Sequence, residues 1–109
     1  MKIGIDIVDL GKFKDSLLSG GDTMKKNIFT KRETSSVKEI SKLAGIFAAK
    51  EAFIKAFSNK KFKMNEIEIG NDKRGKPILK EPASVLRNSK VELSIAHDGN
   101  YVIAVCVII

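Results

Sequence analysis

Apolar residues alternate with polar or small residues near the N-terminus, which is the pattern of a half-buried β-strand. Over residues 1–8, Ile3, Ile5 and Ile7 fall on one face of the predicted strand, and Asp6 falls on the other face among small or apolar neighbours. An acid in the middle of such a strand departs from the pattern. Asp6 is therefore the first candidate for a functional side chain.

Helical spacing of apolar residues follows this strand. The pattern predicts an amphipathic helix with Asp9 as its N-cap, which stops at Gly20 and Gly21. Residues 22–29 are typical of a turn or a short helix. Thr30 then begins a Thr-x-x-Glu capping box, which predicts that a further helix starts there and indicates no chemistry by itself.

The longest helical pattern covers residues 36–57 and contains no proline. On a helical projection at about 100° per residue, with Ile40 at zero, the apolar residues of this segment gather on one face of the helix. Glu51 falls at about 20°, inside that apolar face. An ionised carboxylate there is costly unless a metal, a cation or several donors meet it. Glu51 is therefore a second candidate. The alternative is an ordinary surface pair of Glu51 with Lys55, which would contribute only about 0.2–0.5 kcal/mol.

Strand patterns dominate the second half of the chain. The predicted segments are a strand at 66–69, a basic loop at 70–75, a strand from 78, a short helix at 83–88, a strand at 91–96, an Asp98-Gly99 turn and a strand at 101–109. The last strand is nearly all apolar, so we expect it to be central in a sheet or buried against a partner. This order predicts an α+β fold, with an antiparallel sheet packed on the long central helix.

Composition narrows the class of protein. The chain has 109 residues, of which 43% are hydrophobic and 30% charged, so we expect a single domain over residues 1–109, and disordered and collagen-like classes are excluded. Its longest apolar run, residues 101–109, is far shorter than the roughly 20 residues of a membrane span. With two acids in the first ten residues, a signal peptide is not expected. We expect a full-length cytoplasmic protein in which Cys106, the single cysteine, is a buried small hydrophobe.

The net charge of +7 comes from the first half of the chain. Residues 1–63 carry 14 basic and 7 acidic side chains, whereas residues 64–109 carry 6 of each. A one-sided positive field attracts a polyanion: a nucleic acid, a phosphorylated small molecule or an acidic protein. The pI of 9.6 and the basic loop at 73–76 motivate one alternative, a small RNA-binding module. It leaves Glu51 unexplained, and the scarcity of Arg and aromatic residues disfavours base recognition.

His97 is the only histidine, and it stands at the end of a predicted strand. A lone histidine beside a turn is more often structural than a ligand or a base. The sequence contains no Walker loop, GxGxxG motif, serine triad or HExxH motif, so phosphate or hydrolytic chemistry by those routes is unsupported.

Several motifs nevertheless occur together in a characteristic order. They are GIDIV at 4–8, FTKRE at 29–33, LAGIFAAKEAF at 43–53 with KA at 55–56, EIEI at 66–69, GKP at 75–77 and LSIAH at 93–97. Together they resemble the holo-acyl-carrier-protein synthases, which are small 4′-phosphopantetheinyl transferases. The resemblance implies transfer of 4′-phosphopantetheine from coenzyme A to a serine of an apo acyl carrier protein, with release of adenosine 3′,5′-bisphosphate. It also implies a Mg²⁺ requirement and a place in fatty acid biosynthesis.

The resemblance assigns roles to individual residues. Asp6 and Glu51 would bind Mg²⁺, and Lys55 would contact the phosphoryl group or the leaving diphosphate. Either Glu51 or a metal-bound water would accept the serine proton. His97 and Lys50 would contact coenzyme A. A catalytically inactive interaction subunit is a further alternative, which would keep the assembly but form no product.

Two positions depart from the family pattern. Ile46 stands where many relatives have Arg, and Ala96 stands where most have Ser or Thr. These changes would remove a basic contact to coenzyme A or the carrier, and a hydroxyl contact near the nucleotide. We expect either weaker binding or compensation by a nearby lysine, such as Lys42 or Lys50.

The resemblance also implies a homotrimer with active sites at the subunit interfaces, which would cover the apolar last strand. Because acyl carrier proteins are strongly acidic, the basic N-terminal half offers a docking surface. The candidate docking residues are Lys12, Lys14, Lys25 and Lys26.

Overall fold

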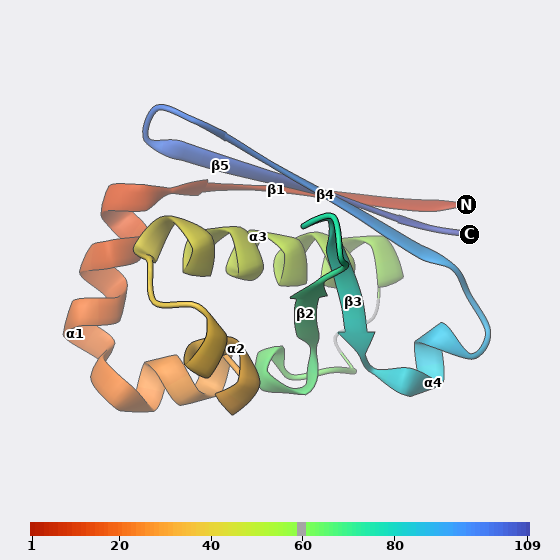
Figure 1. The fold of residues 1–109 in the computed structure, drawn as a ribbon, viewed down its shortest axis with the longest axis horizontal. Helices are drawn as coiled ribbons and strands as arrows, with labels where there is room; N and C mark the ends of the chain where they lie inside the picture. Colours follow the sequence, from red (N-terminus) through yellow and green to blue (C-terminus); the bar gives the residue numbers. More distant parts are fainter. Residues whose placement is uncertain (59–60) are drawn as a thin grey trace.

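A computed structural model describes residues 1–58 and 61–109. Its elements are β1 (Lys2–Asp9), α1 (Leu10–Ile28), α2 (Lys31–Ser36), α3 (Ile40–Phe57), the 3₁₀ turn η1 (Met64–Glu66), β2 (Glu68–Asn71), β3 (Pro77–Glu81), α4 (Ala83–Leu86), β4 (Val91–Asp98) and β5 (Tyr101–Ile108). An antiparallel sheet lies along the long helix α3 (Figure 1). The predicted α+β fold class is confirmed.

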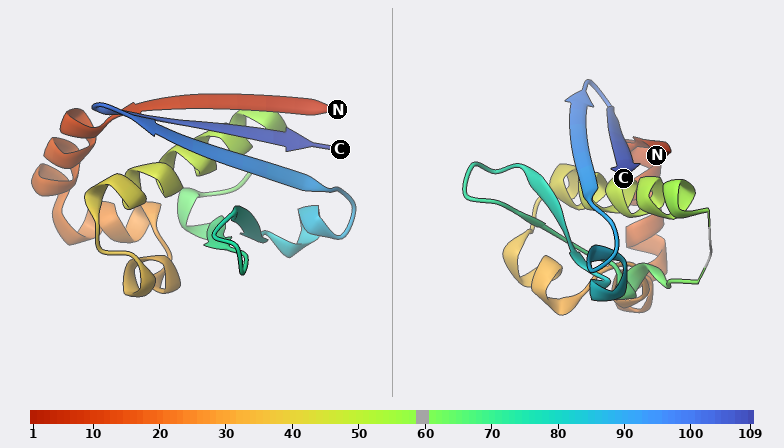
Figure 2. Two further views of the ribbon diagram at one scale, coloured as in Figure 1. Left: turned by 45° about the horizontal axis from the view of Figure 1, so that its top comes forward. Right: turned by 90° about the vertical axis from the view of Figure 1, so that its right-hand side faces the viewer.

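The main sheet has the strand order β1-β5-β4, with every pair antiparallel. The last strand is therefore central, as its apolar sequence predicts. Val102, Ala104 and Cys106 of β5 point toward α3 and are fully buried, and this confirms Cys106 as a core residue. The three strands run side by side above α3, and both chain ends lie at the same end of the sheet (Figure 2).

Helix α3 is covered on both sides. The sheet packs on one side, while α1, α2, η1 and the β2–β3 ribbon lie on the other (Figures 1 and 2). Ala48, Ala49 and Ala52 are fully buried, because alanines let neighbouring backbones approach the helix closely. A helix that is apolar nearly all round is typical of an interior position.

Several predicted boundaries are wrong. The central helix begins at Ile40 rather than at residue 36, because the extended backbone of Val37 separates it from α2. The hairpin turn lies at Gly99 and Asn100, since Asp98 still pairs with Tyr101. The strand predicted from residue 66 begins at residue 68, after η1.

Other local predictions are confirmed. The side chain of Asp9 caps α1 by accepting a hydrogen bond from the Lys12 backbone N–H at 3.1 Å. Helical geometry breaks at Gly21, with φ of 61°, and then resumes to Ile28. Thr30 and Glu33 form the complete capping box of α2. None of the helices that the structure describes is long and apolar enough to cross a membrane.

The outer face of the main sheet is strongly apolar. Ile3, Ile5 and Ile7 of β1 are 62%, 57% and 61% exposed, and Tyr101 and Ile103 of β5 lie on the same face. Exposed patches of this kind usually mark a contact surface.

Candidate active site

The site begins where β1 crosses α3. Gly4 lies against the α3 backbone so closely that a Cβ at this position would overlap the carbonyl oxygen of Ala52. Asp6 is two residues along β1 and points to the same side of the sheet, and Glu51 precedes Ala52 on the helix. This close backbone contact brings a strand acid and a helix acid into one site.

Asp6 and Glu51 line a hollow of about 320 Å³ between β1, α1 and α3. Lys12 contributes a positive charge to its lining, and Phe13 and Phe47 contribute aromatic surface. The ring centroids of these two phenylalanines are 5.4 Å apart. The hollow is thus a partly apolar surface with three carboxylates, those of Asp6, Asp9 and Glu51, and at least one ammonium group; Asp9 is already engaged as the N-cap of α1.

Lys55 pairs with the strand acid rather than along its own helix. Its Nζ donates hydrogen bonds to Asp6 Oδ1 at 3.0 Å and to the carbonyl oxygen of Ile5 at 3.0 Å. No ion pair between Glu51 and Lys55 occurs among residues 1–58 and 61–109. The alternative of a simple surface pair along the helix is therefore wrong.

Burial raises the pKa of the Glu51 carboxyl above its ordinary value, and the negative charge of Asp6 raises it further, while the Lys55 ammonium opposes the change. The two acids are thus close enough to repel each other. A cation placed between them would relieve that repulsion.

These two carboxylates could hold a metal ion only with help from other ligands. In the part of the chain that the structure describes, no group of three or more His, Cys, Asp or Glu side chains could bind a metal. Mg²⁺ is commonly bound in this way, by one or two carboxylates completed by substrate phosphates and water. The donor set at Asp6 and Glu51 therefore fits Mg²⁺ better than it fits a structural metal.

The start of α1 is fixed beside the hollow. Asn100 of the β4–β5 turn donates a hydrogen bond to Asp9 Oδ1 at 3.0 Å, and its carbonyl oxygen accepts the Leu10 N–H at 2.9 Å. Lys12 therefore reaches the rim of the hollow from a helix whose first turn is capped. Lys14 is exposed on the same helix.

Lys50 does not reach a ligand surface, so the expectation that it contacts coenzyme A is wrong. Its side chain is completely buried, and its Nζ is 2.6 Å from Glu33 Oε1. Burial lowers the pKa of Lys50, and the hydrogen bond and charge of Glu33 counteract that effect. The alanines around Lys50 in the motif AAKEA could have indicated its burial, because small residues on both sides of a helix are typical of a helix that is covered on both sides.

His97 lies in a different hollow, of about 530 Å³, between α3, β4 and the β2–β3 ribbon. Its Nε2 is 3.2 Å from the Ser41 carbonyl oxygen. Lys42 and the apolar side chain of Ile46 line the same hollow. Among the described residues, this hollow shares no lining residue with the one that contains Asp6 and Glu51. Sequence reasoning missed the contribution of Asn71 to its lining.

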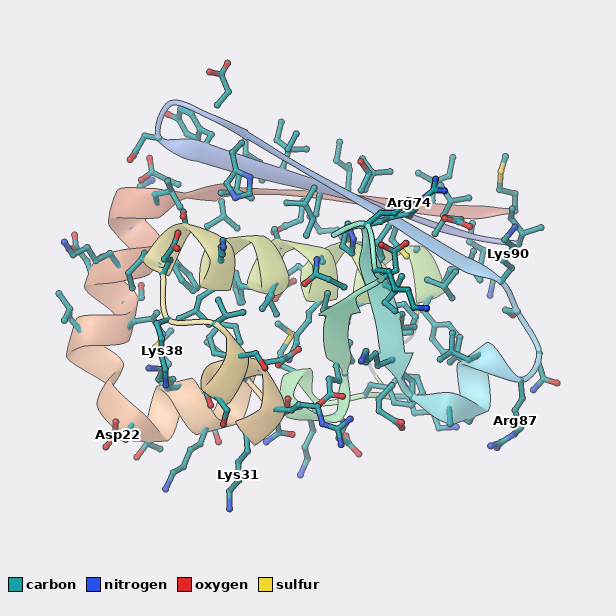
Figure 3. The ribbon with its side chains drawn as sticks, viewed as in Figure 1. Asp22, Lys31, Lys38, Arg74, Arg87 and Lys90 are labelled. Carbon is teal, nitrogen blue, oxygen red and sulfur yellow. The ribbon has the colours of Figure 1, made fainter. Side chains whose placement is uncertain are left out.

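Lys25 and Lys26 lie apart from the acids. They line a third hollow, of about 670 Å³, together with Lys31 and Lys38. Figure 3 shows Lys31 and Lys38 near the corner between α1 and α2, with Asp22 at its edge. The four predicted docking lysines thus divide into Lys12, which lines the hollow of the acids, Lys14, which is exposed on the same helix, and the pair Lys25 and Lys26 at this corner.

Comparison with known proteins identifies the class to which this fold and site belong. The chain belongs to the 4′-phosphopantetheinyl transferase superfamily, whose family model matches residues 2–106. Its relatives include the holo-acyl-carrier-protein synthases of Sulfurovum sp., 34% identical with 99% of this chain and 96% of the relative covered, and of Bacillus velezensis, 40% identical with 97% and 93% covered. The family resemblance carried by the sequence motifs is confirmed.

A solved structure agrees over the whole fold. The Bacillus anthracis holo-acyl-carrier-protein synthase, in complex with coenzyme A (3′,5′-ADP), superposes with a TM-score of 0.82 at 34% identity, covering 98% of this chain and 94% of that one.

Proposed function

We propose that this chain is a holo-acyl-carrier-protein synthase: it transfers 4′-phosphopantetheine from coenzyme A to a serine of an apo acyl carrier protein. The observation that supports this most directly is the meeting of Asp6, Glu51 and Lys55, each supplied by the motif expected to supply it. The activity belongs to residues 1–109 as one domain. The product carrier serves fatty acid biosynthesis, and we place the reaction in the cytoplasm.

The reaction is a displacement at the β-phosphorus of coenzyme A. The serine oxygen forms a new bond to this phosphorus, the bond to the bridging oxygen breaks, and adenosine 3′,5′-bisphosphate leaves. Mg²⁺ held by Asp6 and Glu51 would neutralise diphosphate charge and polarise the phosphoryl group. Either Glu51 or a metal-bound water would accept the serine proton.

Lys55 is assigned to the phosphoryl oxygens. Its ammonium lies 3.0 Å from Asp6 Oδ1 and its side chain is 53% exposed, so it is both adjacent to the proposed metal site and accessible. A positive charge at this point offsets the negative charge that develops on the bridging oxygen as adenosine 3′,5′-bisphosphate leaves.

The His97 hollow is proposed as the other half of the coenzyme A site. Lys42 lies one helical turn before Ile46 and lines the hollow with His97, so it is suited to replace the basic contact that Ile46 cannot provide. Lys50 cannot compensate, because it is buried. Within one chain, the hollow of His97 is separate from the hollow of Asp6 and Glu51. This separation supports an active site that combines one hollow from each of two subunits.

The outer face of the main sheet also supports assembly. It exposes the isoleucines of β1 to water, and a second and third copy of the chain would bury them. We therefore propose a homotrimer with active sites at the subunit interfaces.

The acidic carrier is proposed to dock along α1, where Lys12 lines the hollow of the acids and Lys14 is exposed; Lys25 and Lys26 would extend this surface. The double variant Lys12→Ala/Lys14→Ala should raise the KM for the carrier and weaken its salt dependence, while the KM for coenzyme A stays close to that of the wild type. An unchanged KM for the carrier would exclude this docking surface.

Release of adenosine 3′,5′-bisphosphate tests the proposed function. We expect release that requires coenzyme A, apo carrier and Mg²⁺ together, and no release with a carrier whose acceptor serine is replaced by Ala. Salt-sensitive RNA binding in a filter assay, without turnover, would instead support the RNA-binding alternative.

A further inference from the structure

The ion pair between Lys50 and Glu33 lies wholly inside the protein, and the proposed reaction does not use it. The two side chains are 0% and 1% exposed, and the Nζ–Oε1 distance is 2.6 Å. We infer that this pair positions Glu51: it fixes the rotation of α3 about its axis and the place of α1 beside it. The inference rests on the proposed function, in which Glu51 binds Mg²⁺.

On one side of the pair, all three ammonium protons of Lys50 are used. Besides Glu33, its Nζ donates to the carbonyl oxygen of Ile28 at 2.7 Å, at the end of α1, and to that of Met64 at 3.0 Å, in η1. An ammonium group has three donors. Lys50 therefore has no proton left for a ligand, and it ties α3 to three other elements.

On the other side of the pair, both carboxylate oxygens of Glu33 accept hydrogen bonds. Oε1 also accepts the Thr30 N–H at 2.9 Å, which completes the capping box of α2, while Oε2 accepts the Ile69 N–H of β2 at 2.8 Å. Every partner of Glu33 is a donor, so a glutamine would direct its NH₂ group against another donor. This site requires a carboxylate.

The connection to Glu51 is geometric. Lys50 and Glu51 are consecutive on α3, so their side chains leave the helix about 100° apart, and fixing one fixes the direction of the other. The part of α1 after the break at Gly21, which accepts the Lys50 hydrogen bond at Ile28, also contributes Met24 to the hollow of Glu51. The pair therefore fixes α3 and α1, which both line the proposed metal site, although neither Lys50 nor Glu33 lines it.

Partners that orient metal ligands typically change metal affinity or activity by about 10–100-fold when they are replaced. Lys50→Met is the severe test, because it leaves Glu33 buried without its cation. Glu33→Asp is the milder test: it keeps the charge, but the side chain is one methylene shorter and cannot span Lys50 and the Ile69 N–H together. Val85→Ala is the matched control, because it removes core volume from α4, which packs on β3.

Two readouts are used. The first is the Mg²⁺ concentration that gives half of the maximal increase in Tm in the presence of coenzyme A. The second is the Mg²⁺ concentration for half-maximal turnover, measured at a temperature where each variant is fully folded by circular dichroism. We expect Glu33→Asp to raise both by about tenfold or more, and Val85→Ala to lower the Tm without changing either.

Wild-type Mg²⁺ dependence in Glu33→Asp, or an equal change in Val85→Ala, would show that the pair only stabilises the fold and would overturn the inference. A wild-type protein that responds to Mg²⁺ in neither readout would overturn the proposed function, and this inference with it.

Discussion

At the scale of single residues, the proposed chemistry is assigned to Asp6 and Glu51, with the Lys55 ammonium bound to Asp6. Asp6 is held by Lys55 at 3.0 Å, whereas Glu51 has a pKa raised by burial and by the charge of Asp6. Two acids in one site therefore have different surroundings, and this suits them to different roles.

Replacing either acid should remove the metal-dependent reaction. We expect Asp6→Ala and Glu51→Ala each to reduce turnover by at least a hundredfold, because each removes a proposed Mg²⁺ ligand. Lys55→Met should lower kcat while leaving the Mg²⁺ concentration for half-maximal turnover close to that of the wild type. Steady-state kinetics over a Mg²⁺ series measures both quantities, and normal Mg²⁺-dependent turnover in both alanine variants would contradict the shared site.

The raised pKa of Glu51 gives a pH dependence with a definite sign. Between its ordinary value of 4.5 and its value in the fold, the folded protein binds more protons at this carboxyl than the unfolded chain does. Glu51 therefore adds to the free energy of unfolding of the metal-free protein as the pH falls through its folded pKa. Urea unfolding of the wild type and Glu51→Gln should show a difference that grows in favour of the wild type toward pH 4.5. If the difference in the free energy of unfolding between the two proteins does not vary with pH, the raised pKa of Glu51 is contradicted.

At the scale of elements, the crossing of β1 over α3 determines whether the acids meet. Gly4 permits the contact between the β1 and α3 backbones, and Lys55 of α3 reaches back to Ile5 and Asp6 on the strand. The strand and helix are thus held together directly beside the acids.

Gly4→Ala should separate these two elements. Its Cβ would overlap backbone atoms of α3 that cannot rotate away, so we expect a loss of about 1–3 kcal/mol or more in the free energy of unfolding, together with weaker Mg²⁺ activation. Gly11→Ala in α1 is the control, since its Cβ would meet nothing closer than Asp9 Oδ1 at 3.3 Å. Urea denaturation compares the two, and equal stability would show that the close crossing is not required.

Sequence patterns could predict Asp6 and Glu51, because an acid at an apolar position of a strand or a helix is conspicuous. The family resemblance led to a wrong expectation for Lys50, and the periodicity of α3 did not correct it, because it showed one buried face of the helix rather than two. Glu33 was visible only as a capping residue. Its bonds to Lys50 and Ile69 join segments far apart in the chain, and no local pattern contains such contacts.

At the scale of the whole molecule, two features support the proposed trimer. The outer face of the main sheet exposes isoleucines, and the hollow of Asp6 and Glu51 is separate from that of His97. A trimer would bury the first and bring the two hollows of neighbouring subunits together.

Light scattering should therefore give a mass near three times 12.0 kDa at micromolar concentration. Ile5→Asp, on the outer face, should lower the mass because it places a charge in the proposed contact. Mixing inactive Asp6→Ala subunits with inactive His97→Ala subunits should restore part of the activity, because some sites then combine two intact halves. An active monomer, or no recovery on mixing when both variants assemble, would contradict sites at the interface.

Mass spectrometry of an apo acyl carrier protein, incubated with this protein, coenzyme A and Mg²⁺, tests the central claim most directly. We predict that the carrier gains the mass of one 4′-phosphopantetheine group, and that it gains none with the Asp6→Ala variant or with EDTA. A folded, trimeric wild-type protein that leaves the apo carrier at its original mass would contradict the proposed function.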